Sequence, residues 1–111
     1  MLRVKSDVRA RIRADLRTAI AERDAVRVSM LRTTLAALSN AEAVDPADLP
    51  AGITEVPRRE LDSSAIRSVL EAEHAEAIDA AALLARVGRR AEANELRAKA
   101  AELLRYLDAA G

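Results

Sequence analysis

The stretch DAVRVSMLRTTLAALSNAE, residues 24–42, decides the fold of this chain. Asp24 is a suitable helix N-cap, because its short carboxylate can accept hydrogen bonds from free backbone N–H groups. Apolar residues then recur at spacings of three and four, the period of a helix with one buried face: Val28, Leu31, Leu35 and Leu38. Met30, Ala37 and Ala41 widen this stripe to roughly half of the circumference, more than a surface helix usually buries. We therefore predict a central helix of a bundle, with Leu35 as a core anchor.

Length and composition favour an all-α fold. The chain has 111 residues, which suits a single domain covering 1–111. Half of the residues are hydrophobic, but many of these are alanines, and Tyr106 is the only aromatic residue. Strands usually contain more β-branched and aromatic residues. We therefore predict a small antiparallel bundle of about four helices.

Turn-forming residues divide the chain into two helix hairpins. The first hairpin is expected at 6–43, and its first helix should bury Val8, Ile12, Leu16, Ala19 and Ile20. Residues 44–61 contain all three prolines and Gly52, which predicts a long connection without a helix. The second hairpin is expected at 62–108. Asp62 or Ser63 should cap its first helix, and Gly88 should end that helix in a left-handed conformation.

The sequence carries no signal for a membrane or for secretion. No apolar run approaches the roughly 20 residues that span a bilayer. The basic start, Met1 to Lys5, lacks the apolar core and cleavage site of a signal peptide. There is no cysteine, which excludes disulfides and thiolate chemistry. We expect a cytoplasmic protein with no membrane contact.

Charge is unevenly distributed, although the formal net charge is zero. Residues 1–44 carry nine Lys/Arg and five Asp/Glu, a net +4, whereas residues 45–111 carry nine and thirteen, a net −4. Five arginines form the candidate face for an anionic partner: Arg9, Arg13, Arg17, Arg23 and Arg27. Guanidinium groups suit phosphate, but no aromatic residue lies among them to stack on bases. The alternatives are a solvated helix face and two helix pairs that attract each other.

No catalytic, metal or cofactor site is predicted. His74 is the only histidine and lacks partners at metal-binding spacing, and no glycine-rich phosphate loop is present. Neither lysine, Lys5 or Lys99, is expected in a buried pocket. Glu73 falls within the apolar stripe of its helix, and a buried carboxylate needs a partner. Arg32 is the candidate partner, and the alternative is that Glu73 reaches water at the edge of the stripe.

Two blocks of residues resemble the YqeY-like family, small bacterial proteins related to the tail region of the B subunit of the tRNA-dependent amidotransferase. The first block comprises Asp15, Ala19, Asp24, Leu31, Arg32, Leu35, Asn40 and Glu42. The second comprises Val69, Leu70, Glu73, Gly88, Arg89, Ala93, Ala98, Leu103, Tyr106 and Leu107. The chain differs from the family at Ala75–Ile78, where a basic run is usual, and at Asp108, where proline is usual. The resemblance implies a multihelical bundle, a link to carbon–nitrogen ligation with glutamine as amide donor, and a link to tRNA.

The expected function is that of a non-catalytic helical accessory module within amidotransferase-type assemblies. An unidentified protein is the favoured partner, and tRNA is a weaker candidate. One alternative is a component with carbon–nitrogen ligase activity that uses glutamine. A second alternative is a bundle that associates with further copies of itself into a homo-oligomer.

Overall fold

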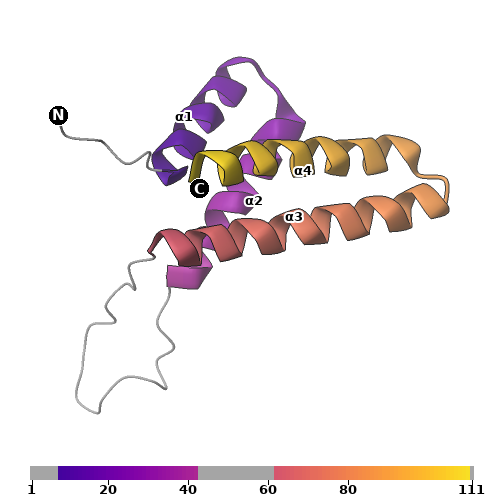
Figure 1. Ribbon diagram of the computed structural model, residues 1–111. Coiled ribbons are helices and arrows are strands. Elements are labelled where there is room, and N and C mark those ends of the chain that lie inside the picture. The colour runs from indigo at the N-terminus through magenta and orange to yellow at the C-terminus, as the bar shows by residue number, and fades with distance from the viewer. Residues whose placement is uncertain (1–7, 43–61, 111) are drawn as a thin grey trace, which may run out of the picture.

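The computed structural model describes residues 8–42 and 62–110, which form four helices in two antiparallel hairpins (Figure 1). The helices are α1 Val8–Ala21, α2 Ala25–Glu42, α3 Ser63–Arg86 and α4 Arg90–Ala110. The prediction of an all-α, four-helix fold is confirmed. The expected connection at 44–61 lies outside the described residues. None of the four helices is both long and apolar enough to cross a membrane.

Short aspartates start two of the helices, as predicted. The Asp24 carboxylate accepts a hydrogen bond from the backbone N–H of Arg27 at 3.1 Å. Asp62 accepts one from the backbone N–H of Ala65 at 2.7 Å. Each bond satisfies a donor in the first helical turn that has no partner within the helix. The start of α2 and the start of α3 are therefore determined by local sequence.

The turns that close the two hairpins share one geometry. In the first, the backbone N–H groups of Arg23 and Asp24 donate to the carbonyls of Ile20 at 3.1 Å and Ala19 at 3.0 Å. In the second, those of Gly88 and Arg89 donate to the corresponding carbonyls of α3 at 3.2 Å and 2.8 Å. This is the Schellman pattern, in which the residue after the cap is left-handed. Gly88 has a φ of 83°, as predicted, but in the first turn an arginine, Arg23, takes this position with a φ of 58°.

Arg23→Gly is therefore expected to raise the free energy of unfolding by about 0.5–1 kcal/mol. A left-handed conformation costs an L-residue roughly 1–2 kcal/mol, and the larger entropy of glycine in the unfolded chain offsets part of that gain. Gly88→Ala should have the opposite sign, at a cost of about 1 kcal/mol, because a Cβ there would meet no atom within 4 Å and only the backbone would be strained. Urea unfolding followed by circular dichroism measures both. A loss of stability in Arg23→Gly would mean that the arginine side chain holds the turn.

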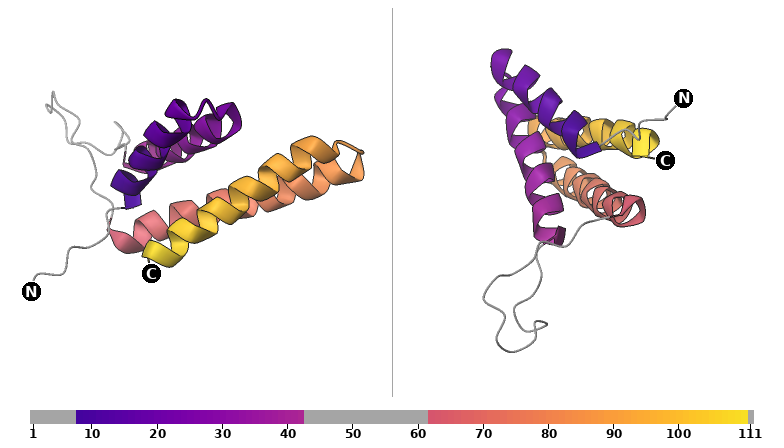
Figure 2. Two further views of the ribbon diagram at one scale, coloured as in Figure 1. Left: turned by 90° about the horizontal axis from the view of Figure 1, so that it is seen from above. Right: turned by 90° about the vertical axis from the view of Figure 1, so that its left-hand side faces the viewer.

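The two hairpins cross, with α2 running over both α3 and α4, and the core lies at the crossing (Figures 1 and 2). Its largest fully buried side chains are Ile12, Leu31, Leu38, Leu70, Leu103 and Thr34. The Thr34 hydroxyl is satisfied by the carbonyl of Met30, to which it donates at 3.1 Å. Leu35 packs against the core but is only partly buried. The prediction that Leu35 anchors the core was therefore wrong. Leu31 and Leu38 are the leucines of α2 that are fully buried in the core.

The apolar stripes predicted for the hairpins run beyond the buried region. Leu16 is half-buried, and Ile20, expected in the core, is 49% exposed. Val87, the residue that caps the end of α3, is 65% exposed. The reason is the crossing, because the turn of each hairpin extends past the other hairpin and nothing in the described residues covers it (Figures 1 and 2).

Candidate functional site

A charged cluster joins three helices next to the core. Arg27 on α2 binds the carboxylate of Glu102 on α4 through two guanidinium nitrogens. Its Nε donates to Oε1 at 3.0 Å and to Oε2 at 3.1 Å, and its Nη2 donates to Oε2 at 2.9 Å. Glu102 is 6% exposed. A carboxylate at this depth requires such compensation, because burying an unpaired charge is costly.

Tyr106 extends the cluster to α1. Its hydroxyl donates to Oδ2 of Asp15 and lies 3.2 Å from Oε2 of Glu102. A phenol has one proton to donate, so Glu102 depends on Arg27 for its compensation. Arg27 also lies near Asp15, with Nη2 3.9 Å from Oδ2. Burial, the hydrogen bond to Asp15 and the charge of Glu102 raise the pKa of Tyr106 far above its usual range. The phenol is therefore protonated at neutral pH.

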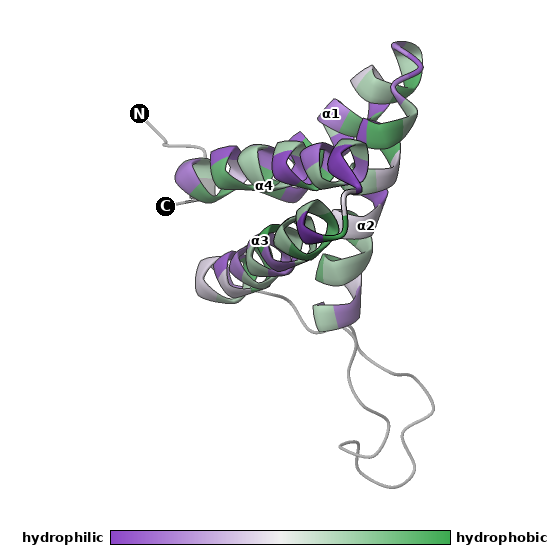
Figure 3. Cartoon of the chain, turned by 90° about the vertical axis from the view of Figure 1, so that its right-hand side faces the viewer, coloured by the Kyte–Doolittle hydropathy of each residue, from purple (hydrophilic) through white to green (hydrophobic). Residues whose placement is uncertain are grey.

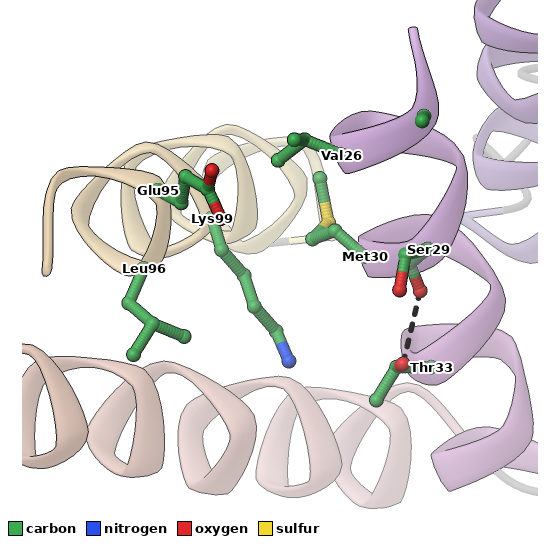
Figure 4. A pocket seen from close by; sticks show the side chains of 8 residues that line it. Val26, Ser29, Met30, Thr33, Glu95, Leu96 and Lys99 are labelled. Atoms are coloured by element: carbon green, nitrogen blue, oxygen red, sulfur yellow. Dashed lines mark hydrogen bonds between the residues drawn. The ribbon is translucent and has the colours of Figure 1, made fainter. Parts of the chain in front are cut away.

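A groove lies between α2 and α4 beside this cluster (Figure 4). It has a volume of ≈ 390 Å³. Its lining comprises Ala25, Val26, Ser29, Met30 and Thr33 of α2 with Glu95, Leu96 and Lys99 of α4. The Lys99 side chain crosses the groove and points its ammonium group toward α3 (Figure 4). The groove thus combines apolar walls with one cation and one exposed carboxylate, that of Glu95.

Lys99, and not Arg32 as predicted, is the partner of Glu73. Lys99 Nζ lies 3.5 Å from Oε1 of Glu73, and the two side chains are 17% and 13% exposed. Arg32, the predicted partner, is exposed and lies on another surface of α2. Lys99 itself is half-buried and lines the groove. Because α3 and α4 lie side by side along their length, a residue of α4 reaches Glu73 more readily than one of α2 (Figure 1).

The structure divides the predicted arginine face. Arg9 forms an ion pair with Glu42, and Arg27 is held by Glu102. Arg13, Arg17 and Arg23 are exposed. Binding of an anionic partner therefore stays a prediction, now with three arginines at the surface instead of five. Among the described residues there is no group of three side chains suited to hold a metal ion, and His74 is half-buried on α3.

Sequence reasoning missed the cluster of Asp15, Arg27, Glu102 and Tyr106. One signal was present: Glu102 and Tyr106 are four residues apart, so both lie on one side of α4. Searches among protein families, curated proteins and solved structures find no match to this chain. The resemblance to the YqeY-like family therefore stays a prediction.

Proposed function

We propose that this chain is a non-catalytic helical interaction module that acts through protein contacts. The observation that carries this proposal is the uncovered end of the α3–α4 hairpin, where Leu83 is 59% and Val87 is 65% exposed one helical turn apart. Neighbouring large apolar side chains at a surface are typical of sites where another protein binds. The resemblance to the YqeY-like family suggests the setting, an assembly related to tRNA-dependent amidotransferases.

The ionisable groups near the core support a structural role. Glu102 is neutralised by Arg27, and Lys99 lies beside Glu73. The ion pair between Lys99 and Glu73 thus serves as a contact between α4 and α3. The alternative, a component with carbon–nitrogen ligase activity and glutamine as amide donor, rests on the resemblance alone.

An amidation assay tests the proposal. The purified protein, mixed with glutamine, ATP, magnesium and mischarged tRNA, is expected to give no Asn- or Gln-tRNA above a protein-free blank. Release of ammonia from glutamine requires a nucleophile, and activation of the carboxylate requires a phosphate cradle with metal-holding carboxylates. A complete tRNA-dependent amidotransferase is the positive control. Product that appears with this protein and disappears in Lys99→Met would overturn the non-catalytic function.

A further inference from the structure

The exposed end of α3 continues a side that is partly buried elsewhere in the same helix. Residues at alternating spacings of four and three lie on one side of a helix. On α3 and its C-cap these are Val69, Glu73, Glu76, Ala80, Leu83 and Val87. Val69 packs against the core beside α2. Farther along, this side emerges from under α2, and it ends at the exposed Leu83 and Val87. The ribbon shows apolar segments along α3 up to the turn (Figure 3).

The adjacent side of α4 behaves in the same way. Leu103 is fully buried at the crossing, Lys99 and Leu96 are half-buried, and Glu92 is exposed near the turn. We call this uncovered side of the hairpin, defined by Leu83, Val87 and Leu96, the outer strip. It meets the groove between α2 and α4, where Val26 is 46% exposed. The groove is thus the inner end of the outer strip.

Charge differs between the two ends of the outer strip. Three exposed arginines surround the turn: Arg86, Arg89 and Arg90. Carboxylates lie toward the groove, where Glu76 and Glu95 are exposed on α3 and α4. The outer strip carries exposed apolar side chains, and Arg89 pairs with Glu92 at the turn. Arg86 and Arg90 leave the turn end basic, whereas Glu76 and Glu95 leave the groove end acidic. Such a strip is complementary to a copy of itself in the reverse direction.

We propose that a second copy of this chain covers the outer strip. Two α3–α4 hairpins lie antiparallel along their outer strips, so that Leu83 and Val87 of one copy contact Val26 and Leu96 of the other. The arginines at each turn approach the glutamates of the partner groove. The contact is isologous, so every interaction occurs twice, and the paired hairpins form a four-helix bundle. This inference rests on the proposed function, a module that acts through protein contacts, because it names the protein that covers Leu83 and Val87.

Sedimentation of the purified full chain tests the dimer. The wild type is expected to sediment with about twice the 12.0 kDa mass of one chain. Leu83→Glu combined with Val87→Glu should raise the dimer Kd by roughly 100-fold or more, since it places four carboxylates in the apolar contact. Ile78→Glu is the matched control, because Ile78 is 45% exposed on another side of α3 and should leave the dimer intact. A wild type of 12.0 kDa at every concentration, or a double variant that remains a dimer, would overturn the inference.

Charge exchange in trans identifies the partner as a second copy. Arg86→Glu with Arg90→Glu makes the turn acidic, and Glu76→Arg with Glu95→Arg makes the groove end of the outer strip basic. Each variant alone should be monomeric where the wild type is dimeric, and an equimolar mixture should form a heterodimer. A mixture that stays monomeric would reject this antiparallel arrangement. The charge-exchange variants also test the dimer if the double variant of Leu83 and Val87 fails to give a helical circular dichroism spectrum. A monomeric wild type would overturn the dimer but would not change the result of the amidation assay. Amide product in that assay would overturn the proposed function and would leave the dimer result unchanged.

Discussion

Leu31→Ala is expected to lower the free energy of unfolding by about 2–5 kcal/mol, the range for large-to-small changes at well-packed sites. Leu31 is fully buried on α2, at the crossing where α1, α3 and α4 also contribute to the core. Because α2 is enclosed by these neighbours, they can collapse into the vacated volume only in part. Thermal unfolding followed at 222 nm should show a decrease in Tm of roughly 4 °C or more for each kcal/mol lost.

Two further leucines make this test specific. Leu35→Ala removes the same atoms from a partly buried position one turn along α2, and it should cost about half as much. Leu104→Ala changes a side chain that is 46% exposed on α4, and it should cost less than about 1 kcal/mol. All three should be measured at one protein concentration. Equal losses in Leu31→Ala and Leu104→Ala would mean that the core does not lie where the hairpins cross.

The helices and their hairpins could be predicted because the signals that define them are local. Asp24 and Asp62 supply hydrogen-bond acceptors within the next turn of chain, and Gly88 adopts the left-handed conformation that ends α3. The apolar period distinguishes a helix from a strand without knowledge of any distant residue. These features therefore placed the ends of α2 and α3 within a residue or two.

The crossing of the hairpins could not be predicted in the same way. A helical wheel shows which side of a helix is apolar, but it does not show how far along that side a neighbour reaches. Ile20 and Leu35 were expected in the core for this reason, although Ile20 is exposed and Leu35 is only partly buried. Thr34 shows that a polar side chain can also join the core, because its hydroxyl donates a hydrogen bond to the carbonyl of Met30.

The polar contacts depend on the same tertiary arrangement. Glu73 was correctly expected to lie within the apolar stripe, yet its partner is Lys99 on α4 and not Arg32 on α2. Arg27 was placed in the candidate face for an anionic partner because its own helix gave no sign of Glu102, which is 75 residues away in the chain. A charge on a helix can therefore be recognised from sequence, whereas its partner depends on how the helices cross.

Arg27→Met is expected to lower the free energy of unfolding by about 3 kcal/mol, because it leaves a buried carboxylate without its cation. Arg27 makes three hydrogen bonds to Glu102 and also lies near Asp15. Without it, the single proton of Tyr106 cannot serve both carboxylates. Urea unfolding at neutral pH measures the loss.

The same cluster provides the controls. Arg105 also approaches Glu102, at 3.7 Å, but its side chain is 70% exposed, so Arg105→Met should change stability by less than about 0.5 kcal/mol. Combining Arg27→Met with Glu102→Met replaces both charges by apolar groups, and it should recover much of the loss seen with Arg27→Met alone. The coupling free energy of this double-mutant cycle is then the contribution of the pair. If Arg27→Met costs no more than Arg105→Met, water and not Arg27 compensates the charge of Glu102, and the cluster does not hold α1, α2 and α4 together.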